Sequence, residues 1–207
     1  LNFQDDVLSL TPSGNPTERH LCQAYEDKSR QIFADPSALA AFWADKLGLE
    51  PAKARQMLDD SPALQGLIRA KTMKRGGVGY VQPEGDAFPD MAAFNRFVSS
   101  AGAIPTCTWL DGTSPGEKVM EQLLDLEMAA GVAALNIIPD RNWNIADPDV
   151  KKMKVDNLYH VVDLARGRAL PIVVGTEMNA PGNKFVDDFD APEMAPLVPE
   201  FVKGAEI

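Results

Sequence analysis

Histidine and cysteine are scarce in this sequence, which has two of each among its 207 residues. No HExxH or CxxC motif occurs in it. His20 and His160 are too few for a histidine-rich zinc site built from this chain alone. Cys22 and Cys107 are far apart along the chain, and Cys107 lies in an apolar run. We therefore expect free thiols, as is typical of proteins from a reducing compartment.

Basic residues and long apolar stretches are also few. Lys and Arg number 20 against 30 Asp and Glu, a formal net charge of −10. This charge argues against nucleic acid or an anionic membrane surface as the partner. No apolar run approaches the roughly 20 residues of a membrane span, and the N-terminus shows no secretory signal. We expect a cytoplasmic protein with a small-molecule partner, and the sequence is compatible with a homo-oligomer.

Residues 1–101 have the pattern of helices joined by short turns. Asn15-Pro16, Asp35-Pro36 and Ser61-Pro62 each place a capping side chain before a proline at the first helical position. A basic, glycine-rich segment at 68–83 interrupts the helical pattern. We therefore predict a mainly helical N-terminal subdomain that includes this segment.

Residues 102–207 alternate between strand and helix. Short apolar runs occur at 103–110, 132–138 and 170–175, with amphipathic segments between and after them. This spacing predicts right-handed βαβ units and a parallel sheet. Three strands alone would make a thin sheet. We therefore expect an α/β fold in which these residues are a segment of a (β/α) barrel or a doubly wound layer. We favour the barrel, and we expect the chain to be a fragment of it.

Polar residues cluster where the three predicted strands end, and in parallel α/β folds such residues gather around one pocket. They are Asp111, Asp140, Arg141, Asn142, Glu177 and Asn179. A structural alternative is that Arg141 only pairs with Glu177 in a loop. Asp187 and Asp188 follow the third strand and are interpreted as a solvated loop or a helix cap. The convergence of strand ends predicts a site at this edge of the sheet.

A second candidate for anion binding is the basic segment. Lys71, Lys74 and Arg75 lie beside the pattern Gly-Gly-x-Gly, which is neither a dinucleotide fingerprint nor a P-loop. Their side chains and the glycine N–H groups are suited to a phosphate or a carboxylate. We expect Lys71 or Lys74 to contact the anionic group of the substrate.

Several stretches together resemble a known type of protein: IPTCTWLDG, LNIIPDRNWN, PIVVGTEMNAPGNKFVDDF, NPTERH and IRAKTMKRGGVGYVQP. They are similar to an uncharacterised bacterial family related to metal-dependent PHP and amidohydrolase-type (β/α) barrels. In PHP-like enzymes a strand-terminal Gly-x-Glu supplies a metal-binding carboxylate, which Gly175-Thr176-Glu177 matches here. The H-x-H pair and further histidine ligands of such enzymes do not occur. Either they lie outside this chain or the metal centre has been lost.

The resemblance implies a metal-dependent hydrolase, or an isomerase of the uronate isomerase type, acting on a small anionic sugar- or phosphate-derived substrate. It implies a divalent metal (Zn, Mn or Mg) with Glu177 as ligand and Asp140 as a second carboxylate, serving as ligand or general base. Arg141 would be a second catalytic residue and, with Asn142 and Asn179, would hold the substrate, which Asp111 would also contact. The alternative is a non-catalytic, degenerate barrel module that binds a small anion or serves as an assembly interface.

Overall fold

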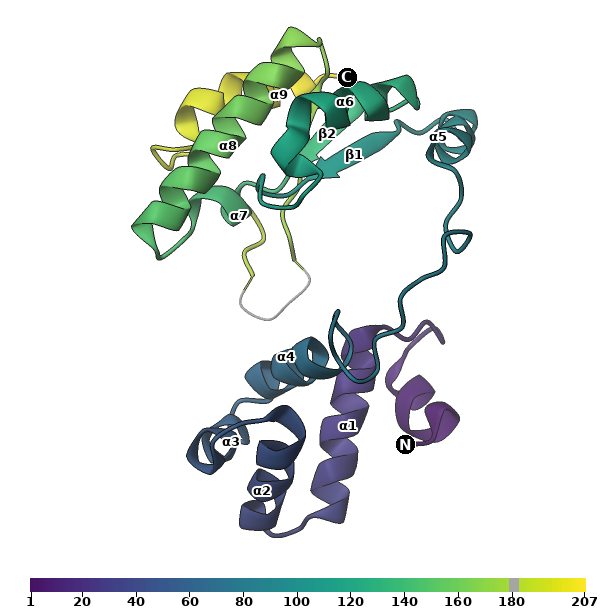
Figure 1. Ribbon diagram of the computed structural model, residues 1–207, viewed down its shortest axis with the longest axis vertical. Coiled ribbons are helices and arrows are strands. Elements are labelled where there is room, and N and C mark those ends of the chain that lie inside the picture. Colours follow the sequence, from purple (N-terminus) through teal and green to yellow (C-terminus); the bar gives the residue numbers. More distant parts are fainter. Residues whose placement is uncertain (179–182) are drawn as a thin grey trace. The chain divides into compact units, whose positions relative to one another are not determined.

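The computed structural model describes residues 1–178 and 183–207. They form two compact units, Leu1–Gly85 and Asp86–Ile207 (Figure 1). The division lies at residue 85 instead of near 101, because helix α5 (Met91–Ser100) belongs to the second unit. There the Asn95 side-chain amide donates a hydrogen bond to the Ala130 carbonyl at 3.0 Å.

The first unit is helical, as predicted. Its elements are a π-helix at Phe3–Val7, a 3-10 helix at Leu8–Leu10, α1 (Glu18–Ile32), α2 (Pro36–Leu47), α3 (Pro51–Met57) and α4 (Ser61–Thr72). Asp35 caps α2 as expected, whereas Asp60 caps α4 one residue before the predicted cap at Ser61. The cap of α1 is Thr17, which forms a capping box with His20. The proline-based starts are therefore right to within two residues.

A buried carboxylate ties α1 to α4 in this unit. Glu26 is 2% exposed. Its Oε1 accepts hydrogen bonds from Arg30 at 2.7 Å and Ser61 at 2.6 Å, and its Oε2 accepts one from Gln65 at 2.8 Å. Burial raises the pKa of Glu26, but the hydrogen bonds from Ser61, Gln65 and Arg30 outweigh it, so that the pKa lies below its usual range. The charge is thus compensated inside the helical unit.

The second unit is a parallel α/β unit. After α5 come β1 (Thr106–Trp109), a 3-10 turn at Glu117–Val119, α6 (Met120–Ala129), β2 (Ala134–Ile137), α7 (Asp140–Trp143), α8 (Pro148–Gly167), β3 (Ile172–Val174), a 3-10 turn at Ala195–Leu197 and α9 (Val198–Ala205). The strands pair in parallel in the order β1-β2-β3. The prediction of three strands and a parallel sheet is confirmed.

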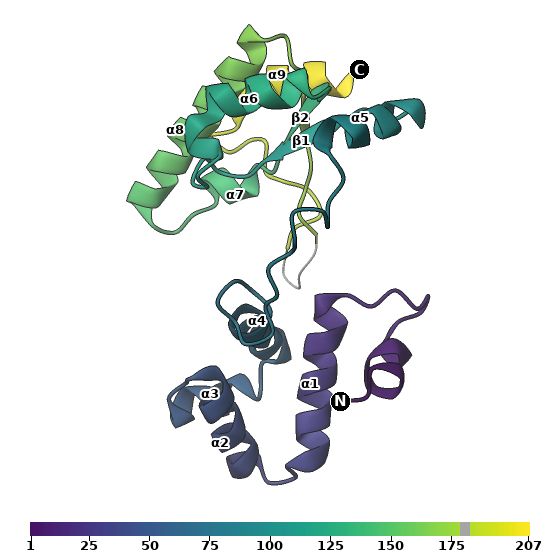
Figure 2. The same cartoon turned by 45° about the vertical axis from the view of Figure 1, so that its right-hand side comes forward.

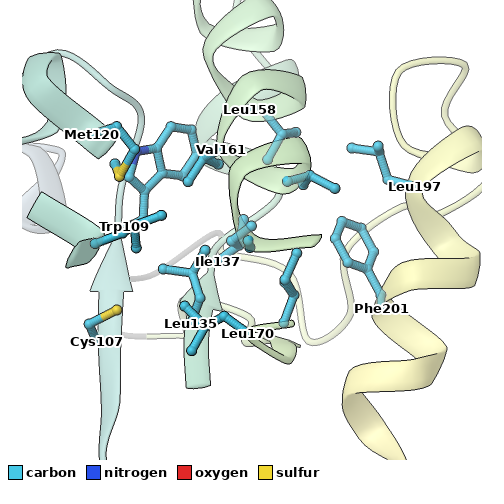
Figure 3. Close-up of a cluster of buried hydrophobic side chains, with 14 of the residues drawn as sticks. Cys107, Trp109, Met120, Leu135, Ile137, Leu158, Val161, Leu170, Leu197 and Phe201 are labelled. Atoms are coloured by element: carbon cyan, nitrogen blue, oxygen red, sulfur yellow. The ribbon is translucent and has the colours of Figure 1, made fainter. Parts of the chain in front are cut away.

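One face of this sheet is covered by helices, and α6 and α8 lie over it in both views (Figures 1 and 2). The hydrophobic core lies between the sheet and these helices. There alternate strand residues such as Trp109 and Ile137 contact α8 (Figure 3). Figure 3 also shows Leu197 and Phe201 pointing from the C-terminal segment into this cluster. On the other face Thr106 and Thr108 are exposed. The face that carries Thr106 and Thr108 also carries Ala134 and Val173 and is thus of mixed polarity.

Helix α9 packs against β3 at Gly204. A Cβ added there would overlap the carbonyl oxygen of Ile172, which is backbone and has no rotamer by which to move away. We expect Gly204→Ala to lift α9 from β3 and to lower the free energy of unfolding by about 3 kcal/mol.

The matched control for Gly204→Ala is Gly167→Ala in the last turn of α8, where an added Cβ meets no atom within 4 Å. There the same change should stabilise by about 0.5–1 kcal/mol, through the better helix propensity of alanine. Urea denaturation of the two variants measures both effects. Equal stability of Gly204→Ala and wild type would show that α9 does not pack this closely.

Both cysteines are free and buried. Burial raises the pKa of the Cys22 and Cys107 thiols. Neither therefore has the lowered pKa and the exposure of a reactive thiol. In the part of the chain that the structure describes, every helix is too short or too polar to cross a lipid bilayer.

Candidate functional site

A pocket of about 240 Å³ lies where β2 and β3 end. Its walls come from the loops that follow these two neighbouring strands. They are Ile138, Asp140, Arg141, Asn144, Thr176, Glu177, Asn183, Lys184 and Asp187. Of the predicted site residues, the structure brings Asp140, Arg141 and Glu177 together here. The rule that polar groups gather at the carboxyl ends of parallel strands therefore holds for β2 and β3.

The short helix α7 positions the first of these groups directly after β2. Asn142 within it is fully buried, and its amide donates to the carbonyls of Leu110 and Ile138, each at 3.1 Å. These bonds fix α7 to the ends of β1 and β2. Asn142, predicted to hold substrate, thus anchors the helix that presents Asp140 and Arg141, and it does not line the pocket.

Arg141 and Glu177 form an ion pair across the pocket, with Nη1 and Oε2 3.1 Å apart. Their side chains are 37% and 32% exposed, so the pair contributes at most about 1 kcal/mol to stability. Asn183 donates a hydrogen bond to the Glu177 carbonyl at 2.6 Å. This is the structural alternative for Arg141 and Glu177 considered above. It leaves the Glu177 carboxylate bound to a cationic side chain of the protein.

Asp140 faces the pocket with a cation beside it. The Lys184 ammonium lies 3.6 Å from Oδ2 of Asp140 and 5.2 Å from the centre of the Trp143 ring. The Asn144 amide reaches the same oxygen at 3.5 Å. The Asp140 side chain is 24% exposed. It is accessible to a molecule in the pocket and is held by two donors.

Asp187 lies behind Asp140 and is nearly inaccessible. It is 4% exposed, and its Oδ2 accepts a hydrogen bond from the Thr176 hydroxyl at 3.1 Å. Oδ1 of Asp187 and Oδ1 of Asp140 are both buried, and neither has a hydrogen-bond partner among the described residues. Burial raises the pKa of Asp187, the hydrogen bond from Thr176 offsets part of this, and the Asp140 carboxylate raises it further. The site therefore holds two interacting carboxyl groups.

The metal that the resemblance implies does not fit the donors that the structure describes. Within residues 1–178 and 183–207, no group of three His, Cys, Asp or Glu side chains has an arrangement that could hold a metal ion. Glu177, the expected ligand, is paired with Arg141. Carboxylate-bound divalent cations need further oxygen ligands in addition to two side chains. We therefore assign none of these carboxylates as a metal ligand.

Three other predicted site residues lie elsewhere. Asp111 is paired with Lys154 on α8 at 2.9 Å and is not part of the pocket wall. Burial raises the pKa of Asp111, but the hydrogen bonds from Thr113 and Lys154 outweigh it, so its pKa is lowered. Asp111 thus joins the end of β1 to α8.

Lys71 and Lys74 belong to the first unit. Lys74 pairs with Glu18 at 2.9 Å, and Lys71 is exposed in α4. Asn179, also predicted to hold substrate, lies outside the described residues.

Sequence reasoning missed Lys184, Thr176 and Asp187 as parts of the site. Asp187 stands in the acidic run VDDFD, which is typical of a solvated loop. Its burial depends on the return of this loop beneath Thr176 and Asp140, which no local pattern indicates. Lys184 offers a weak signal, because it is the single cation in the loop between β3 and the C-terminal helical segment.

Comparisons of the chain with protein-family models, curated proteins and solved structures give no match.

Proposed function

We propose that the pocket at the ends of β2 and β3 is the active site of a hydrolase or an isomerase that acts on a small anionic substrate. The observation that supports this best is that Arg141 and Lys184 line the same pocket as Asp140. Cations suited to bind a phosphate or carboxylate are thus placed beside a carboxylate that can move a proton.

The size of the pocket supports a small substrate. At about 240 Å³ it is smaller than the roughly 300–1,000 Å³ of sites for drug-sized ligands. A sugar acid or a small phosphate ester is compatible with this volume. The anionic group would take the place of Glu177 at Arg141 or approach Lys184, while Asp140 acts as the general base.

We further propose that the sheet is a segment of a (β/α) barrel. Its strands follow chain order, and its core-forming side chains face the helices. Thr106 and Thr108 on the opposite face are exposed, as expected if further strands complete an interior there. Active sites of such barrels lie at the carboxyl ends of the strands, which is where this pocket lies.

One observation favours the alternative, a module that binds a small anion without catalysis. Both cations of the pocket already have carboxylate partners, Arg141 with Glu177 and Lys184 with Asp140. A ligand must compete with these pairs. Binding and turnover therefore have to be tested separately.

The binding arm of the test uses inorganic phosphate and malonate as probes. Both should raise the unfolding temperature of the full chain, because a ligand that binds only the folded state stabilises it. Lys184→Gln should weaken phosphate binding about tenfold, the effect of losing one charge-assisted contact. Isothermal titration calorimetry gives the dissociation constants.

The matched control for Lys184→Gln is Lys118→Gln, which removes the same charge from an exposed position outside the pocket wall. It should bind phosphate as wild type does. No binding by wild type, or equal losses in the two variants, would contradict an anion site at this pocket.

A further inference from the structure

The carboxyl pair Asp140 and Asp187 is the feature of the pocket that the proposed function does not explain. Both Oδ1 atoms are buried, and the described residues supply no hydrogen bond to either. Two ionised carboxylates in this arrangement would repel each other without solvent to screen them. A proton between them removes the repulsion and satisfies both oxygens.

The surroundings decide which residue holds that proton. Asp140 has the Lys184 ammonium and the Asn144 amide at its Oδ2, and its side chain is 24% exposed. A cation and a neutral donor therefore face the exposed oxygen of Asp140. Asp187 is 4% exposed, and its hydrogen-bond donors, the Thr176 hydroxyl and the backbone N–H of Asp140, are both neutral.

The other charged groups of the pocket wall, Arg141 and Glu177, form an ion pair with each other. The cations of the pocket wall are thus paired with Glu177 and with Asp140. Among the residues that the structure describes, Asp187 has no cation beside it, and it is the carboxyl group to which we assign the proton.

We propose that Asp187 is held as a neutral carboxylic acid that donates its proton to Oδ1 of Asp140 and so orients Asp140 towards the pocket. Asp187 is then a positioning residue, and Asp140 is the group that meets the substrate. The inference deepens the proposed function and relies on it for the role of Asp140. The protonation of Asp187 itself does not depend on any substrate.

The role of this hydrogen bond follows from where it acts. A donor on Oδ1 leaves Oδ2 of Asp140, on the exposed side, as the oxygen that accepts a proton from the substrate or from water. The same bond fixes the carboxylate plane, because Oδ1 is held by Asp187 while Lys184 and Asn144 hold Oδ2. A base with a fixed plane needs less reorganisation in the transition state.

The direct test is infrared difference spectroscopy of the full chain at neutral pH. A neutral carboxyl group has a carbonyl stretch that is separate from the bands of ionised carboxylates. We expect one such band in wild type, its loss in Asp187→Asn, and its retention in Asp188→Asn. Asp188 is the adjacent, exposed aspartate and therefore a matched control.

Stability against pH supplies the second readout. A neutral Asp187 in the folded state has a raised pKa, whereas in the unfolded chain the residue ionises near its ordinary value. As pH rises between these two pKa values, the unfolded state releases the proton first. The folding equilibrium therefore weakens by up to about tenfold per pH unit in this window. Asp187→Asn should lack this loss, and its unfolding midpoint should rise relative to wild type as pH increases.

Asn is the informative replacement because it copies the neutral acid. Its carbonyl oxygen can accept from Thr176 while its amide donates to Asp140. Asp187→Ala removes both hydrogen bonds and should have a lower unfolding midpoint than Asp187→Asn.

Absence of the infrared band in wild type, together with stabilisation of wild type but not Asp187→Asn by millimolar Mg²⁺, would overturn the proposal. The pair would then be ionised and would bind a cation. Failure of phosphate to bind would contradict the anion site instead and would leave the band in place, so the two proposals fail separately.

Discussion

Replacing Asp140 with Asn is expected to lower turnover by about 10²–10⁴-fold, the usual contribution of a general base. Asn has nearly the shape of Asp and can still contact Lys184 through its amide oxygen, but it does not accept a proton at neutral pH. The ion pair with Lys184 is half-exposed at 3.6 Å, so its loss should change the free energy of unfolding by less than about 1 kcal/mol. The variant should therefore fold and bind phosphate.

The measurement is a screen of phosphate monoesters and sugar acids with wild type, followed by kcat for any substrate that is turned over. Asp188→Asn is the control, since it removes a carboxylate from the same loop without touching the pocket wall. Equal turnover of Asp140→Asn and wild type would contradict the assignment of the base. Anion binding without turnover of any compound would favour the non-catalytic module.

Glu26→Ala should lower the free energy of unfolding of the helical unit by about 3 kcal/mol, as expected when one partner is removed from a buried, hydrogen-bonded charge cluster. Arg30, Ser61 and Gln65 all donate to this carboxylate and would be left without their acceptor. The Arg30 side chain is 39% exposed and can regain water, which places the loss at the lower end of the usual range.

Hydrogen exchange of α1 and α4 in the full chain measures the effect of Glu26→Ala, with Glu84→Ala as the exposed control. The dependence on pH adds a second check. Because the pKa of Glu26 is lowered by folding, its contribution is present above the unfolded pKa and is lost as pH falls through the folded value. Glu26→Ala should thus lose less stability in acid than wild type. Unchanged protection of α1 and α4 would show that the cluster does not join them.

The amino-acid sequence alone determined the local elements, because their signals are short-range. Asp35-Pro36 begins α2, as predicted. The three apolar runs form parallel strands, and their spacing is sufficient to predict the sheet. The polar residues that follow the strands also predicted that Asp140, Arg141 and Glu177 lie together, since the carboxyl ends of parallel strands meet at one edge of the sheet.

The tertiary structure alone decided what each polar side chain does. Asn142 and Asp111 have the same strand-end position in the sequence as Asp140, yet Asn142 bonds to the carbonyls of two strand ends and Asp111 pairs with Lys154 on α8. Asp187 reads as a solvated loop residue and is instead 4% exposed behind Asp140. Several of these contacts join residues far apart along the chain, such as Asn142 with Leu110 and Asp111 with Lys154. A local pattern therefore specifies where a polar residue stands but not what it contacts.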